Sequence, residues 1–191
     1  MGLDDYEQVQ VTSRAALRQW LAANADTSPG IWLVMPRRGS TDRRPTYDEV
    51  VEEALCFGWI DSTQRPRDEH FTLQLLTPRK PTSMWSARNK ERLARLLEAG
   101  LMTERGLRAV ELARSNGSWT LLDAVERLEV PEDLAAALDA IPGARTFFDA
   151  MPPGVRKQHL WFVVSAKRPQ TRATRIERVA TEAALGRRTV T

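Results

Sequence analysis

The polar residues whose types could do chemistry gather in residues 58–89 of the chain. Within this stretch Arg79 and Lys80 lie just before a helix that we expect to begin at Ser83 or Ser86. Two cations, serine hydroxyls and the free N–H groups of a helix N-terminus together favour an anion. The pattern therefore predicts an anion-binding site. A serine that only caps the helix, beside an Arg79 that pairs with a surface acid, would explain these residues equally well.

Asp61 and Asn89 add an acid and an amide to the same stretch. Asp61 follows Trp59 in an expected strand, and alternation places both side chains on one face. Asn89 shares a helical face with Trp85, four residues before it. An aspartate followed by hydroxyl residues more often holds local backbone groups than a ligand. The candidate ligand-binding residues are Trp59, Asp61, Arg79, Lys80, Ser83, Trp85 and Asn89.

A second basic surface is expected near the C-terminus, around a loop and the start of a helix. Its residues are Lys167, Arg168, Arg172, Arg175 and Arg178. Basic residues at a helix start oppose the helix dipole, so an acidic partner would relieve an unfavourable interaction. Residues 123–150 contain 2 basic and 7 acidic residues, whereas residues 151–191 contain 9 and 2. We favour this acidic block of the same chain as the partner.

Several classes of enzyme find no support in the sequence. It contains no P-loop, no dinucleotide-binding glycine motif, no His-Glu-x-x-His and no Gly-x-Ser-x-Gly. The two histidines, His70 and His159, are too few for a histidine-rich metal site. The single cysteine, Cys56, lies in an apolar run and excludes an internal disulfide. We expect no metal and no cofactor, and no catalytic residue can be named.

The elements that must position these residues follow from the periodicity of the apolar side chains. Helices are expected after Ser13, Thr46 and Thr103, a strand at 31–35, a polar loop at 37–44, and a hairpin formed by 59–65 and 71–77. Beyond residue 131 every segment reads as helix. The prediction is an α+β fold: a small antiparallel sheet packed with helices in residues 1–120, an acidic connector at 121–130, and an all-helical module at 131–191.

A family resemblance rests on four long phrases of the sequence, at 47–62, 77–89, 100–107 and 165–172, and on the pair Arg175-Ile176 that follows the last of them. In these phrases the chain resembles the YdeI/OmpD-associated family, also called bacteriocin-protection proteins. The resemblance implies a cytoplasmic bacterial protein. The family is named for resistance to bacteriocins or antimicrobial peptides and for association with an outer-membrane porin. It implies no reaction and no catalytic residues.

We therefore expect a non-enzymatic protein of bacterial stress or envelope defence that holds an anionic ligand or peptide in a polar groove. One alternative is nucleic-acid binding through the Arg-rich C-terminal helix, which the isoelectric point near 9.4 would suit. Another is an uncharacterised enzyme with Asp61 as acid or base. The acidic N-terminus leads to no apolar segment, so we expect a cytoplasmic location without membrane insertion. The sequence does not indicate an oligomeric state.

Overall fold

The computed structural model describes residues 2–37 and 44–188, so most of the polar loop expected at 37–44 lies outside the described residues. The chain divides into two compact units, unit 1 (Met1–Thr120) and unit 2 (Leu121–Thr191). Across the described ranges, no helix is both long and apolar enough to cross a membrane.

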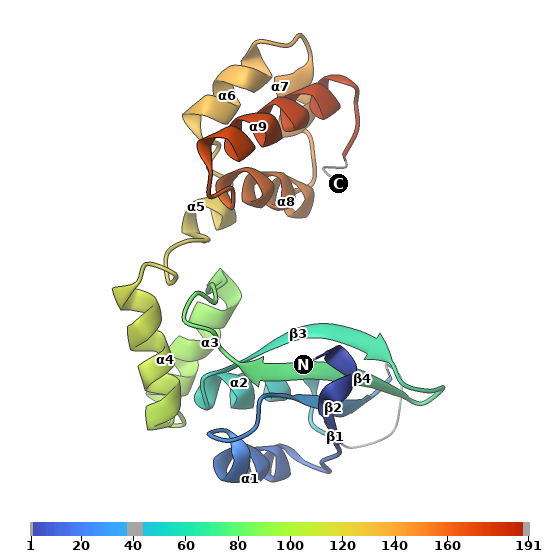
Figure 1. The fold of residues 1–191 in the computed structure, drawn as a ribbon, viewed down its shortest axis with the longest axis vertical. Helices are drawn as coiled ribbons and strands as arrows, with labels where there is room; N and C mark the ends of the chain where they lie inside the picture. The colour runs from blue at the N-terminus through green and yellow to red at the C-terminus, as the bar shows by residue number, and fades with distance from the viewer. Residues whose placement is uncertain (1, 38–43, 189–191) are drawn as a thin grey trace. The chain divides into compact units, whose positions relative to one another are not determined.

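Unit 1 is built on a four-stranded sheet with the order β1-β2-β4-β3 (Figure 1). The strands are β1 (Glu7–Val9), β2 (Ile31–Pro36), β3 (Trp59–Pro66) and β4 (Phe71–Pro78). The expected hairpin is the antiparallel pair β3–β4, and β2 is antiparallel to β4. The α+β prediction is confirmed, although the sheet is mixed, because β1 pairs in parallel with β2. Helix α1 (Arg14–Asn24) supplies the crossover that a parallel pair needs.

Both faces of the sheet are covered, which explains why β2 is apolar without interruption. On one face, side chains such as Leu33, Trp59 and Leu76 pack against four helices. These helices are α1, α2 (Tyr47–Cys56), α3 (Ala87–Glu98) and α4 (Glu104–Ser115). The other face, which includes Trp32, is covered by the N-terminal segment with the short helix η1 (Leu3–Asp5). The indole Nε1 of Trp32 donates to the carbonyl of Leu3 at 2.7 Å.

Side-chain caps fix where the helices of unit 1 begin. Ser13, Thr46 and Thr103 cap α1, α2 and α4 as the sequence predicts, and Glu49 completes a capping box with Thr46. Helix α3 begins after Ser86, whose hydroxyl accepts the backbone N–H of Asn89. The other candidate for this start, Ser83, lies in the preceding turn.

The N-terminus of α4 docks on the C-terminal end of α2. The carbonyl oxygen of Cys56 accepts both the backbone N–H of Thr103 at 3.1 Å and its hydroxyl at 2.5 Å. The Cys56 side chain is fully buried in the core, and this burial raises the pKa of its thiol. Gly106, in the first turn of α4, lies against the same carbonyl.

Unit 2 is entirely helical in its described residues, in agreement with the sequence prediction. Its helices are α5 (Asp123–Glu126), α6 (Glu132–Asp139), α7 (Ala144–Asp149), α8 (Pro153–Val164) and α9 (Pro169–Ala184). They enclose a separate apolar core that includes Leu134, Phe148 and Val179. Within residues 121–130, Val125 of α5 joins this core, and Glu126 accepts a hydrogen bond from Lys157 at 2.5 Å.

His159 makes the stability of unit 2 sensitive to pH. Its ring is fully buried against Phe148, Nε2 lies 3.0 Å from the carbonyl of Arg188, and burial lowers the pKa of the imidazole below 6.5. As the pH falls below 6.5, the unfolded chain takes up a proton that the folded imidazole resists, so the free energy of unfolding should decrease. Urea unfolding at about pH 7.5 and about pH 5.5 should show a smaller decrease for His159→Phe than for wild type. Equal decreases would contradict this role.

Candidate functional site

Arg79 is held at the point where β4 ends. Its backbone N–H donates to the carbonyl of Gly58 at 3.0 Å, which ties it to the start of β3. The guanidinium lies over the ring of Trp85, with Cζ 3.8 Å from the ring centroid. Nη1 donates to the carbonyl of Met84 at 3.1 Å. Backbone and ring together therefore fix the position and plane of this cation.

Two of the three guanidinium nitrogens of Arg79 lack a partner. Nε and Nη2 are buried and have no hydrogen bond to any described residue, and Arg79 forms no ion pair there. Burial lowers the pKa of Arg79 to about 10, while the charge of Asp61 favours the protonated form. Arg79 is therefore a cation at neutral pH. Buried donors of a cation that lack an acceptor are costly, and an anionic acceptor would offset that cost.

A narrow cleft lies beside Arg79. It is lined by Arg79, Lys80, Pro81, Ser83, Trp85 and three residues of α4, Ala109, Leu112 and Ala113. Its volume of about 20 Å³ is enough for one water-sized group. The Ser83 hydroxyl accepts the backbone N–H of Lys80 at 3.0 Å, and Asn116 Nδ2 donates to the carbonyl of Pro81 at 2.7 Å. These bonds fix the turn that carries Lys80. Because the cleft has room for one water-sized group, a single ligand atom, such as one oxygen of an anion, can enter it.

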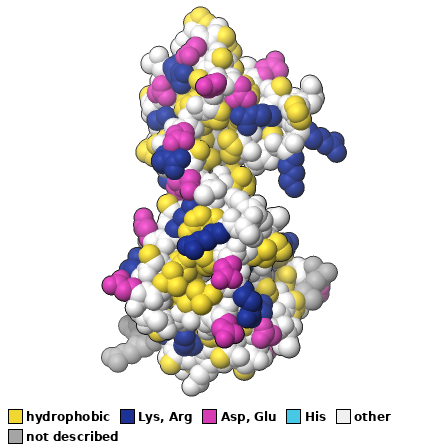
Figure 2. Space-filling model, turned by 90° about the vertical axis from the view of Figure 1, so that its left-hand side faces the viewer, with side chains coloured by type: hydrophobic (Ala, Val, Ile, Leu, Met, Phe, Trp, Pro, Cys, Tyr) yellow, Lys and Arg dark blue, Asp and Glu magenta, His cyan; other side chains and the backbone are white. Residues whose placement is uncertain are grey.

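Further cations surround the tryptophans of this site. Trp119 packs against Trp85 with ring centroids 5.1 Å apart. Lys90 Nζ and the guanidinium of Arg114 each lie 4.9 Å from the centroid of Trp119. Hydrophobic side chains gather on the face of unit 1 that carries α4, where Leu112 is exposed beside the cleft (Figure 2). The site thus combines positive charge with an apolar margin.

The other three predicted ligand-binding residues do not line this cleft. Trp59 is fully buried and packs edge-on against Trp20 in the core. Asp61 accepts the hydroxyl of Tyr47 at 2.5 Å, and burial followed by this bond raises the pKa of Tyr47 to about 12. Asn89 Oδ1 accepts from Arg92 Nη1 at 2.9 Å. The structure brings Arg79, Lys80, Ser83 and Trp85 together, and it gives the other three separate partners.

Two family models match the chain. Residues 9–109, more than half of its length, match the family described as Domain of unknown function (DUF8412). The chain belongs to the DUF8412 family. Residues 127–186 match the family described as Bacteriocin-protection, YdeI or OmpD-Associated, which confirms the resemblance for unit 2. The phrases at 47–62, 77–89 and 100–107 lie within the DUF8412 match. No curated protein and no solved structure matches the chain.

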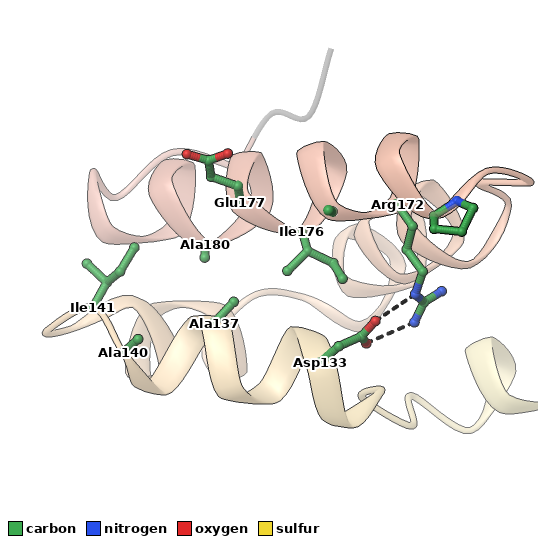
Figure 3. Close-up of a pocket in the computed structure, with 10 residues that line it drawn as sticks. Asp133, Ala137, Ala140, Ile141, Arg172, Ile176, Glu177 and Ala180 are labelled. Carbon is green, nitrogen blue, oxygen red and sulfur yellow. Dashed lines mark hydrogen bonds and ion pairs between the residues drawn. The ribbon is translucent and has the colours of Figure 1, made fainter.

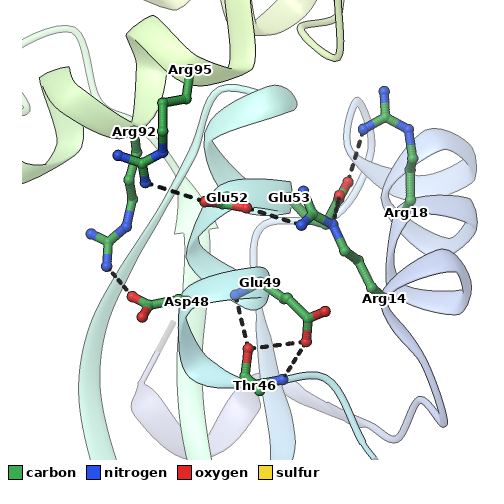
Figure 4. Close-up of polar contacts among 9 residues, drawn as sticks. All are labelled: Arg14, Arg18, Thr46, Asp48, Glu49, Glu52, Glu53, Arg92 and Arg95. Atoms are coloured by element: carbon green, nitrogen blue, oxygen red, sulfur yellow. Dashed lines mark hydrogen bonds and ion pairs between the residues drawn. The ribbon is translucent and has the colours of Figure 1, made fainter. Parts of the chain in front are cut away.

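The DUF8412 region also contains a charged cleft of about 190 Å³ between α2 and α3. Three acids and three arginines line it: Asp48, Glu52, Glu91, Arg88, Arg92 and Arg95. Arg92, which is only 5% exposed, pairs with Asp48 and lowers the pKa of that carboxyl, while Arg95 pairs with Glu52 (Figure 4). Each arginine here is paired with a carboxylate. This cleft is therefore a weaker candidate for anion binding than the cleft beside Arg79.

The predicted basic surface lies outside the DUF8412 match, in unit 2. Arg172 forms a two-pronged ion pair with Asp133, at 2.7 and 2.9 Å, which lowers the pKa of Asp133. Arg175 Nη1 donates to the carbonyl of Phe162 and to the Ser165 hydroxyl. Lys167, Arg168 and Arg178 are exposed. Two of the five cations are therefore already engaged within the chain.

No group of three or more His, Cys, Asp and Glu side chains among the described residues could hold a metal ion. The sequence stretch 58–89 includes Arg79 and its neighbours in the turn, but not Lys90, Arg114 or Trp119. These three residues reach the site only through packing of α3, α4 and the segment after α4. No local sequence motif predicts these contacts.

Proposed function

We propose that this chain is a non-enzymatic binding protein of bacterial stress or envelope defence, and that unit 1 holds the anionic group of a small ligand or peptide at Arg79. The two unpartnered, buried nitrogens of Arg79 carry the binding part of this proposal. The match of residues 127–186 to a bacteriocin-protection family supports the defence part. The cytoplasmic location and the lack of a cofactor stay predictions.

The chemistry of Arg79 favours a carboxylate or phosphate over other anions. Nε and Nη2 lie on one edge of the planar guanidinium, so both can donate to one oxygen of such a group that enters the cleft. Trp85 covers one face of the cation, so an ion pair there is less screened than on an open surface. Lys80 is exposed at the rim and adds positive charge. Because the cleft is small, the rest of the ligand would lie outside, along Leu112.

The two alternatives have weaker support in the geometry. Nucleic-acid binding would rest on Lys167, Arg168 and Arg178, because the other two cations of the basic surface have partners within the chain. An enzyme with Asp61 as acid or base would have to release that carboxylate from Tyr47. Arg79, by contrast, has donors without an acceptor.

Thermal unfolding in the presence of anions tests the proposal. We expect acetate, phosphate or citrate, added at constant ionic strength, to raise the melting temperature of the wild type in a saturable manner. At a hundredfold excess over Kd the rise should be about 5 °C or more. Arg79→Gln should abolish this rise, and Lys80→Ala should weaken binding about threefold while leaving the melting temperature without anion unchanged. Intrinsic tryptophan fluorescence gives the Kd independently.

Arg88→Gln is the matched control, because Arg88 is an exposed arginine of the same unit that is paired with Asp48. It should respond to anions as the wild type does. If Arg79→Gln, shown to be folded by circular dichroism, has the same anion response as the wild type, the site is not at Arg79.

A further inference from the structure

A separate cavity lies in unit 2, and none of the residues that line the Arg79 cleft lines it. It is a groove of about 580 Å³ between α6 and α9. Its walls are almost wholly apolar: Ala137, Ala140 and Ile141 from the α6 side, and Pro169, Ala173, Ile176 and Ala180 from α9. In Figure 3, Ala137, Ile176 and Ala180 lie between the two helices. A groove of this size and lining is typical of a binding site.

Charged residues at the groove leave a negative charge without a partner. At one end, Asp133 and Arg172 neutralise each other through their two-pronged ion pair (Figure 3). Glu177, on α9, also lines the groove and is exposed. It forms no ion pair or hydrogen bond with any described residue. A partner that covers the groove therefore gains if it places a basic residue next to Glu177.

The shape of the groove restricts what can fill it. The groove is open to solvent along one side, so an acyl chain or flat small molecule would stay partly exposed there. An occupant with one apolar face and one polar face would bury the apolar face in the groove and leave only the polar face in contact with water. The alanines on both helices leave room for larger side chains to insert, as in the packing of a third helix on two others. From residue 133 to residue 141 the groove is about 12 Å long, or about two helical turns.

We propose that the groove between α6 and α9 docks an amphipathic helix of a partner protein, with apolar residues at positions i, i+3 or i+4, and i+7, and with a lysine or arginine facing Glu177. This site is independent of Arg79. The partner presents an apolar face and positive charge here, whereas the Arg79 site takes negative charge.

Designed helical peptides test the proposal on the full chain. A set of fluorescently labelled amphipathic peptides, with Leu, Ile or Phe at the apolar positions, carries Lys along the flank, and a matched set carries Glu there. We expect at least one Lys peptide to bind in an anisotropy titration. It should bind about fivefold tighter than its Glu counterpart, and added salt should reduce that difference. Binding by no peptide, or equal binding of the two sets, would overturn the proposal.

Two substitutions locate the binding. Ala173→Phe fills the groove from an exposed position and should weaken binding of the Lys peptide about tenfold. Ala184→Phe makes the same change on the same helix, at an exposed residue outside the groove, and should bind like the wild type. Glu177→Lys should remove the preference for Lys peptides, whereas Glu111→Lys, an equal charge change in unit 1, should keep it.

The same variants distinguish a partner helix from a second copy of this chain. If sedimentation shows a concentration-dependent dimer that Ala173→Phe abolishes and Ala184→Phe does not, the groove is a self-association surface and the proposal is wrong. Unchanged peptide binding by a folded Ala173→Phe protein would also overturn it.

Discussion

Replacing Glu53 with alanine should lower the free energy of unfolding by about 3 kcal/mol. Glu53 is only 2% exposed on α2, and its two oxygens accept from Arg14 Nε at 2.7 Å and Arg18 Nη1 at 2.9 Å, both on α1 (Figure 4). Without the carboxylate, two cations at this helix interface lose their partner. Both arginines are about a third exposed, so water can hydrate them and the loss should be at the lower end of the range for broken buried ion pairs.

Urea unfolding followed by tryptophan fluorescence measures the effect, and Glu52→Ala provides the control. Glu52 lies next to Glu53 and pairs with Arg14 and Arg95, but its side chain is more accessible. We expect that variant to lose about 1 kcal/mol or less. Equal losses for the two variants would show that burial of Glu53 adds nothing to its ion pairs.

Gly106→Ala should cost about 3 kcal/mol, against the usual preference of helices for alanine. A Cβ at this position would overlap the carbonyl oxygen of Cys56 and crowd the methyl group of Met102. The Cys56 carbonyl also receives both hydrogen bonds of Thr103, so α4 cannot move away from α2 without weakening its own docking. Thermal melting followed by circular dichroism should show a transition several degrees lower.

Gly154→Ala is the matched control for this prediction. Gly154 lies in the first turn of α8, and a Cβ there would meet nothing within 4 Å. The same substitution should therefore be neutral or stabilise the chain by up to about 1 kcal/mol. If Gly106→Ala behaves like Gly154→Ala, the contact between α4 and the end of α2 is looser than the structure indicates.

Much of the fold could be predicted because local signals agree with the final packing. The capping box of Thr46 and Glu49 and the hairpin of β3 and β4 are examples. Strand β1 could not be found in this way. It is three residues long, only Val9 is buried, and its pairing to β2 depends on the crossover through α1. The parallel part of the sheet therefore follows from tertiary structure and not from a local pattern.

The candidate site was only partly predictable for a related reason. Alternation along a strand says which residues share a face, but not which face the helices will cover. Trp59 therefore looked like a groove residue and is a core residue. The place of Arg79 before a helix indicated a role, whereas Trp119 and Arg114 come from beyond α3. Trp119 joins the site by packing on Trp85, and Arg114 lies over the ring of Trp119. The groove between α6 and α9 arises from alanines on two helices, none of which is distinctive alone.

The burial of Cys56 gives this chain a practical advantage for spectroscopy. Its thiol is fully enclosed by the core, and its raised pKa keeps it in the unreactive protonated form at neutral pH. A new cysteine at an exposed position, for example in place of Ala184, would be the only accessible thiol on the folded chain. A maleimide dye or spin label could then be attached at a chosen site without removing the native cysteine.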